Sequence, residues 1–313
     1  MFGIKRYSSE KALEWNHFVA TAKNGTFLFD RRYMDYHSDR FRDYSLMFYL
    51  DDQLYALLPA NAKDDTLYSH QGLTYGGLVM SEHCRMAEIG ELFRQLNDYL
   101  LTEGFHTVVY KPIPSFYCSL PSEEDLFALT GVCHAAISSR SVASVVDLTH
   151  RLSLSKLRKR GIRKASNQGL IVEESADFPA FWKVLEENLL EKYHATPVHS
   201  LAEMGLLHER FPLNIRLFVV KKDDRIVGGT VLYISRDIVK TQYISADAEG
   251  KKMGAIDILF DSLLSQFEEE RYHYFDFGTS NLPEDNSLNE SLIQQKEGFG
   301  GRAVCYDTYE WKL

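Results

Sequence analysis

The residues best suited to proton transfer lie in the second half of the sequence. Asp276 follows apolar residues in YHYFDFG, where burial could raise its carboxyl pKa and make it a base, or where it could accept a backbone hydrogen bond. Tyr243, in KTQYISAD, could orient an amine, donate to an oxyanion or pack as a core tyrosine. His194 and His199 stand in YHATPVHS, and a histidine can accept a proton from an ammonium near neutral pH. These residue types are typical of acid–base chemistry.

The most strongly charged stretch is basic and runs from Arg151 to Lys164. It holds seven Lys or Arg and no acid, whereas the whole chain has a net charge of −9. The acidic total argues against general nucleic-acid binding, so the basic stretch is a local feature. It predicts contact with an anionic ligand such as CoA, a sugar-nucleotide or a tRNA acceptor stem, with Arg163 among the contacts. The alternative is a solvated helix that pairs with acidic residues such as 268–270.

Metal and disulfide chemistry find little support in the sequence. The four cysteines are scattered: Cys84, Cys118, Cys133 and Cys305. Without a CxxC pair, a zinc ribbon or thioredoxin-type site is excluded. The histidines lack an HExxH motif or nearby clustered carboxylates, so we predict no metal. No apolar run of about 18 residues and no secretory signal is visible, and we expect a reduced, cytoplasmic setting.

The elements that must position these residues recur in two halves. Trp15 and Trp182 lie in similar apolar helices 167 positions apart, and Phe93 and Phe260 repeat that spacing. At 313 residues, the chain also exceeds the usual length of one domain. We therefore predict an N-terminal domain at 1–150 and a C-terminal domain at 151–313. The last strand is a candidate for exchange with the N-terminal domain.

Periodicity and capping signals predict the elements of the second half. Helices are expected at 152–169, 177–193, 200–211 and 253–270, and strands at 170–175, 215–221, 226–235, 238–245, 272–278 and 303–313. Ser153 or Ser155 could cap the first of these helices, and Asp177 the second. The expected class is α/β (α+β), with a mixed, largely antiparallel sheet flanked by helices in each domain.

This order of strands and helices resembles the GNAT acyl-CoA N-acyltransferase fold. Two such units in tandem resemble the FemABX aminoacyltransferases and the wider FemAB-like acyltransferases, a bacterial type of transferase. The segments that carry the resemblance are SLSKLRKRGIRKASNQGLIV, TQYISADAEGKKMGAIDILFDSLL with YHYFDFGTSN, and QQKEGFGG. The resemblance covers nearly the whole chain as architecture.

The resemblance also implies roles for particular residues. The acyl donor would lie along strand 238–247 and reach the N-terminus of helix 253–270, whose free N–H groups can hold phosphate. The residues implied for the donor are Ser245, Ala246, Lys251, Lys252, Gly254 and Ala255. Lys296 matches the FemABX lysine that lies beside the reacting carbonyl and favours its negative charge; the alternative is a surface lysine before a glycine turn. Lys296, Asp276 and Tyr243 are the candidate catalytic residues. The candidate substrate-binding residues are Arg31, Tyr33, Tyr75, His194, His199 and Arg163.

The sequence departs from these families in two places. The second half has no coiled-coil insertion of the kind that binds seryl-tRNA in FemABX proteins. The segment EGKKMGA lacks the spacing of the Q/RxxGxG/A phosphate signature, and SEHCRMAEIGELF in the first half has no such loop. We therefore expect one donor site, in the second half.

Three functions remain open at this point. The leading hypothesis is an N-acyltransferase that moves an acyl group from acyl-CoA, acetyl-CoA or a related activated donor to an amine by direct attack. The acceptor would be a small molecule or a cell-envelope precursor. The first alternative is an aminoacyl-tRNA-dependent aminoacyl or peptidyl transferase, with tRNA at 151–164. The second is a non-catalytic tandem GNAT module that binds a ligand.

Overall fold

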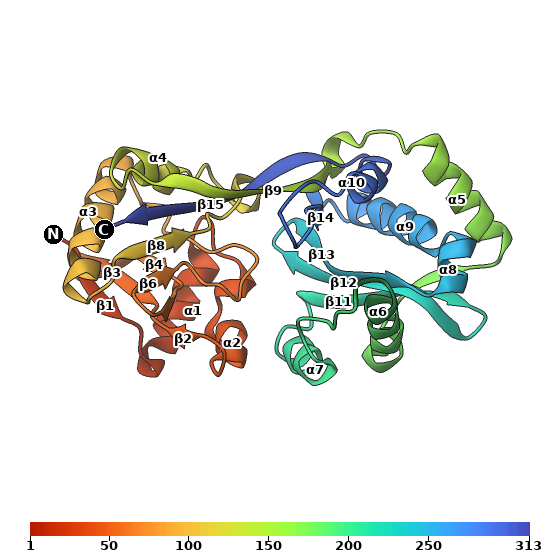
Figure 1. Ribbon diagram of the computed structural model, residues 1–313, viewed down its shortest axis with the longest axis horizontal. Coiled ribbons are helices and arrows are strands. Elements are labelled where there is room, and N and C mark those ends of the chain that lie inside the picture. Colours follow the sequence, from red (N-terminus) through yellow and green to blue (C-terminus); the bar gives the residue numbers. More distant parts are fainter. The chain divides into compact units, whose positions relative to one another are not determined.

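The fold was examined in a computed structural model. It describes the backbone of residues 1–313 and every side chain except those of Lys192 and Tyr193. The chain divides into two compact units, Met1–Ser141 with Cys305–Leu313, and Val142–Val304. Each unit combines strands with helices (Figure 1), which confirms the mixed α/β class.

The first unit is built from short strands and amphipathic helices. Its strands are β1 (Gly3–Arg6), β2 (Arg42–Asp43), β3 (Leu46–Leu50), β4 (Gln53–Leu58), β5 (Asn61–Lys63), β6 (Thr66–Tyr68), β7 (Val79–Met80), β8 (Thr107–Tyr110), the first half of β9 (Ala136–Asp147) and most of β15 (Arg302–Lys312). Its helices are α1 (Ala12–Thr21), α2 (Arg31–Met34), α3 (Met86–Thr102) and α4 (Glu124–Gly131), with 3-10 turns at Ser9–Lys11, Phe27–Phe29, Asp35–His37 and Ser115–Tyr117.

The C-terminal strand completes the core of this first unit. β15 pairs antiparallel with β8, from Tyr309 opposite Tyr110 to Lys312 opposite Thr107. Trp311 is buried among the aromatic side chains of this core, with its ring 6.5 Å from that of Phe93. Strands β1, β3, β4 and β7 form a separate sheet in that order.

The second unit holds the longest strands. They are β10 (Ile171–Ser175), β11 (Ile215–Lys222), β12 (Arg225–Ser235), β13 (Ile238–Ala246), β14 (Tyr274–Thr279) and the second half of β9, and they neighbour one another in this order. Its helices are α5 (Lys156–Asn167), α6 (Phe178–Tyr193), α7 (Leu201–Arg210), α8 (Ala248–Met253), α9 (Ala255–Glu269) and α10 (Glu290–Glu297), with a 3-10 turn at Leu148–His150. Figure 1 shows α5, α8, α9 and α10 over one face of the sheet and α6 and α7 over the other.

Side chains near the helix ends explain where several of these helices begin. Ser155 caps α5 by accepting a hydrogen bond from the Arg158 N–H, and Asp177 caps α6 by accepting from the Ala180 N–H. Ser200 forms a capping box with Glu203 at the start of α7. These helices begin within four residues of the positions expected from the sequence.

The helix expected at 253–270 is present as α9, which begins at Ala255 and ends at Glu269, but the segment before it is helical as well. Gly254 adopts a left-handed backbone with φ of 89°, which ends α8 and starts α9 after it. A continuous helix cannot pass through this conformation, which glycine adopts readily and other residues rarely do. The polar loop before the predicted helix is thus a short helix of its own.

Candidate active site

An opening between β13 and β14 lies at the centre of the second unit. The two strands run parallel and pair only from Ile238 opposite Tyr274 to Lys240 opposite Asp276. β13 continues beside β12 to Ala246, and a register shift near Gln242 bulges it between Thr241 and Tyr243. A bulge leaves backbone groups outside the regular ladder. Backbone N–H and C=O groups are therefore available where the strands separate.

A cavity of about 330 Å³ lies at this opening, in the size range of small-molecule sites. Its apolar wall comes from β13, α9, β14, α10 and the loop after it: Ile244, Ile256, Phe260, Phe277, Leu292 and Phe299, with Leu189 of α6. Its polar lining is Asn188, Ser245, Lys251, Gln295 and Lys296. The mixture suits a ligand with an apolar group and a reacting polar group.

Lys296 lies in this cavity, and its amine is held by two backbone carbonyls. Its Nζ donates to Gly278 O at 2.9 Å and to Thr279 O at 2.7 Å. Burial lowers the pKa of Lys296 to about 8. The negative charge of Asp276 raises this pKa, and the positive charge of Lys240 lowers it further. The third hydrogen of the ammonium, or the lone pair of the neutral amine, is left for a ligand.

Three charged side chains gather around Gly278: Lys296 donates to its carbonyl, Asp276 accepts from its N–H, and Lys240 lies close by, where its Nζ donates to Thr241 O at 3.3 Å. Asp276 is completely buried, and its Oδ1 accepts a hydrogen bond from the Gly278 N–H at 2.6 Å. Gly278 has φ of 70°, and a Cβ there would lie 3.3 Å from Lys240 Nζ. Asp276 thus bonds to backbone in its own strand end. Sequence reasoning missed Lys240; its only signal is a lysine inside an apolar strand.

Tyr243 and His199, expected in different roles, lie together beside the bulge of β13. The Tyr243 hydroxyl accepts a hydrogen bond from the His199 backbone N–H at 3.1 Å and lies 2.7 Å from His199 Nδ1. The edge of the Trp182 ring packs near Tyr243, and burial raises the pKa of the phenol. His194, in contrast, is an exposed residue at the end of α6.

The residues expected to hold donor phosphates have several other partners. Asp247 caps α8 by accepting from the Gly250 N–H at 2.6 Å, and it also pairs with Arg225. At the start of α9, a Cβ on Gly254 would lie 2.7 Å from the Gly161 carbonyl oxygen of α5. The N-terminus of α9 is therefore in contact with α5.

The charged residues that line a neighbouring recess are mostly acidic. This recess, of about 340 Å³, adjoins the cavity through Asn188, Ala246 and Lys251. Its carboxylates are Glu187, Glu191, Asp247 and Glu249, and its cation is Lys251. Two of the residues implied for the donor are already hydrogen-bonded: Lys251 Nζ donates to Asn188 Oδ1, and the Ser245 hydroxyl donates to Val184 O at 3.2 Å. Lys252 is exposed. Of the six implied donor residues, Ser245, Ala246 and Lys251 line the cavity; Lys252, Gly254 and Ala255 do not.

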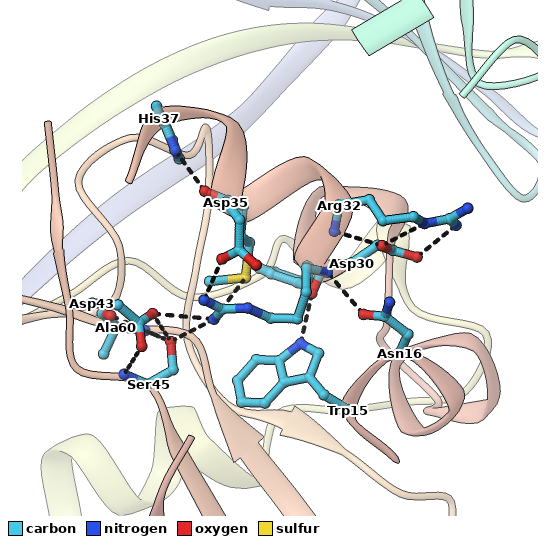
Figure 2. Close-up of polar contacts among 12 residues, drawn as sticks. Trp15, Asn16, Asp30, Arg32, Asp35, His37, Asp43, Ser45 and Ala60 are labelled. Carbon is cyan, nitrogen blue, oxygen red and sulfur yellow. Dashed lines mark hydrogen bonds and ion pairs between the residues drawn. The ribbon is translucent and has the colours of Figure 1, made fainter. Parts of the chain in front are cut away.

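The substrate residues expected in the first unit are buried there. Arg31 forms ion pairs with Asp35 and, at 3.1 Å, with Asp43, and its guanidinium lies 3.8 Å from the Tyr7 ring centre. Its Nη1 also donates to Ser45 Oγ at 3.2 Å, and Figure 2 shows Asp35, Asp43 and Ser45 among the polar contacts of this region. Tyr33 packs edge-on against Phe27.

Tyr75 is equally engaged, because its hydroxyl donates to Thr26 Oγ1 at 3.2 Å. The roles of Arg31, Tyr33 and Tyr75 in acceptor binding stay predictions. Arg163 lies on the exposed face of α5. Among the described side chains, no group of three or more His, Cys, Asp or Glu could hold a metal ion.

Comparison with known proteins identifies the fold and the domain. Residues 154–285 match the family profile of the acetyltransferase (GNAT) domain. A crystal structure of FemX superposes with a TM-score of 0.69 at 10% identity, covering 99% of this chain and 97% of that chain. The C-terminal domain of a putative lysylphosphatidylglycerol synthetase from Agrobacterium fabrum gives 0.62 at 14% identity, covering 97% and 92%.

A tandem GNAT protein from the clavulanic acid biosynthesis pathway gives a TM-score of 0.55 at 11% identity, covering 100% and 98% of the two chains. A search of curated protein sequences found no match. The chain therefore has a FemAB-like tandem GNAT fold, and its second unit carries a GNAT acetyltransferase domain. The fold and domain support an N-acyltransferase. No described helix is long and apolar enough to cross a membrane.

Proposed function

We propose that the second unit transfers an acyl group from an activated donor to an amine by direct attack, in the opening between β13 and β14. The observation that carries this proposal is Lys296, whose amine lies in the cavity with two of its hydrogens held by Gly278 O and Thr279 O. A fixed cation beside an apolar wall is suited to a carbonyl that gains negative charge during attack.

The reaction needs positioning more than reactive side chains. The donor carbonyl would lie near Lys296, and the neutral amine would attack it, forming the C–N bond before the bond to the leaving group breaks. Lys296 Nζ, with a backbone N–H of the β13 bulge, would stabilise the oxyanion. Holding two reactants together can supply about 7–11 kcal/mol, and one oxyanion donor about 3–4 kcal/mol.

The Tyr243–His199 pair would handle the proton of the acceptor amine. The phenol lies 2.7 Å from His199 Nδ1, so a proton taken from the amine by Tyr243 can pass to the imidazole. His199 would later return it to the leaving group. Asp276 and Lys240 act through Lys296 and the Gly278 backbone, and we regard them as positioning residues.

The donor proposed is acyl-CoA, acetyl-CoA or a related thioester, and the acceptor is an amine on a small molecule or cell-envelope precursor. Such thioesters are made inside cells, so the proposed reaction is cytoplasmic. An aminoacyl-tRNA donor is the second candidate, favoured by the basic face of α5, and it predicts ribonuclease-sensitive activity. A ligand-binding module without turnover is the third.

The first test compares thermal unfolding with CoA, acetyl-CoA, a longer acyl-CoA, and charged or uncharged tRNA. A ligand at about 100 times its Kd adds about 2.7 kcal/mol to the free energy of unfolding. A thioester that shifts the melting temperature is then assayed for acyl transfer to a panel of amines. Binding without transfer to any amine would favour the non-catalytic module.

Lys296→Met is the decisive variant in that assay. We expect kcat to fall about 10²–10³-fold, as for loss of an oxyanion donor. Lys183→Met, which removes an exposed cation of α6, is the matched control and should keep most activity. Full activity of Lys296→Met with a normal melting curve would contradict the proposed role.

A further inference from the structure

The outer face of α5 carries an unusual excess of unpaired positive charge. Five of its residues are exposed, and none pairs with an acidic side chain among the described residues: Lys156, Lys159, Arg160, Arg163 and Lys164. At 100° per residue they fall on one arc of the helix. Cations on the inner side behave differently, because Arg158 pairs with Asp257 of α9.

Apolar side chains are exposed on the same surface. Leu157 is 59% exposed within α5, and Leu152, just before the helix, is 44% exposed. A phosphate backbone gains little from an exposed leucine, whereas protein interfaces combine apolar contacts with charged groups around them. The mixture of Leu157 with five cations therefore favours an acidic protein over RNA.

The inner side of α5, opposite this face, contacts the wall of the cavity. The Ser155 N–H, at the start of α5, donates to Gly298 O at 2.8 Å. The Arg158 guanidinium lies 5.4 Å from the ring centre of Phe299, which lines the cavity. A macromolecule bound to the outer face of α5 would therefore lie close to the reaction site.

The charge near the donor end of the cavity has the opposite sign. The recess there carries Glu187, Glu191, Asp247 and Glu249 against Lys251. The start of α8 is already occupied by the Asp247 carboxylate. Free CoA would bring its three phosphates against these carboxylates, whereas a thioester arm attached to a protein has one phosphate and no nucleotide. The cations on α5 can then complement an acidic carrier.

We propose that the exposed face of α5 docks an acidic acyl carrier protein, whose thioester-bearing arm enters the cavity beside Lys296. This inference rests on the proposed acyl transfer and names its donor. The acceptor nitrogen forms a bond to the thioester carbonyl carbon, the C–S bond breaks, and the proton released by the amine ends on the thiol of the carrier.

The test measures binding, so it does not depend on knowing the acceptor. The probe is an acyl carrier protein of bacterial fatty-acid synthesis, loaded through a stable amide, and its Kd for the full chain is measured at low and moderate salt. Lys159→Glu with Arg163→Glu should raise the Kd about tenfold or more and reduce its salt dependence. The control is Lys63→Glu with Arg85→Glu, which makes an equal change of charge at exposed positions of the first unit. This control should leave the Kd unchanged.

Leu157→Ser distinguishes a protein from RNA on this surface. It should weaken binding of the carrier and leave binding of uncharged tRNA unchanged. The inference is overturned if the charge reversals on α5 do not affect the carrier, or if the carrier fails to bind while tRNA binds through α5. Carrier binding without acyl transfer from a loaded carrier or acyl-pantetheine to any amine would instead count against the proposed function alone.

Discussion

Lys296 illustrates how neighbouring groups determine the charge of a single amine. Burial removes water from the ammonium and lowers its pKa to about 8, although the nearby Asp276 favours the charged form. The carbonyls of Gly278 and Thr279 then fix its direction. At neutral pH the amine is mostly protonated, so it can stabilise an oxyanion, and it loses that ability at moderately alkaline pH.

The pH dependence of Lys296 can be isolated by a ratio of rates. The ratio of kcat/KM for the wild type to that for Lys296→Met should fall as the pH rises through about 8, because the ammonium becomes neutral. Dividing by the Met variant removes the titration of the acceptor amine. Lys296→Arg keeps its charge in this range, so its ratio to the Met variant should stay flat. A wild-type ratio that rises with pH would assign Lys296 as a base instead.

At the scale of elements, the break at Gly254 decides the surroundings of the site. It directs α9 against α5, where Gly161 permits the close approach: a Cβ on Gly161 would lie 1.9 Å from Asp257 Oδ2. The ion pair of Arg158 with Asp257 adds to this contact. The α5 helix is thereby fixed on the cavity side of the second unit, with its basic face outward.

Gly254→Ala should lower the free energy of unfolding by about 1–3 kcal/mol, because alanine is strained at φ of 89°. Its Cβ would also lie 2.7 Å from a backbone oxygen of α5. Urea unfolding measures the loss as a lower midpoint. Gly205→Ala is the control, since nothing lies within 4 Å of its Cβ position inside α7, and it should be neutral or stabilising by up to about 1 kcal/mol. Equal midpoints for the two variants would contradict the strain argument.

At the scale of the whole molecule, the chain returns to its first unit after completing the second. Cys305–Leu313 belong to the first unit, where β15 pairs with β8 and Trp311 fills the core. The first unit therefore lacks a strand until residues 305–313 have been made. Its core is completed by a segment far along the chain, since Lys312 lies 205 positions after its partner Thr107 in β8.

Trp311→Ala should destabilise the first unit by about 3–5 kcal/mol, the usual cost of removing a large buried aromatic side chain. Hydrogen exchange should speed up in α3 and β8, whereas amides of β12 and α9 keep their protection because their core is separate. Arg302→Ala, at an exposed position of the same strand, is the control. Equal loss of protection in both units would show that the two cores unfold together.

Much of the second unit was predictable because its signals are local. Helical periodicity located α5, α6 and α7, with Ser155 and Asp177 among the candidate caps, and short turns between apolar runs located β11 to β13. Apolar periodicity also located α9 to within two residues, whereas the short helix α8 was expected as a loop because Glu249, Lys251 and Lys252 make its segment polar.

By itself, the sequence determined the order of elements, the tandem GNAT resemblance and a short set of candidate residues that includes Lys296, Tyr243 and His199. The order of elements follows from neighbours a few positions apart, whose periods and caps are readable along the chain. The choice of Lys296 rests instead on the resemblance of its segment to known families. Only the tertiary structure decided that Lys240, Asp276 and Lys296 gather around Gly278, and that Asp247 occupies the start of α8. Those contacts depend on strand register, burial and helix packing, which join residues that carry no local sign of one another.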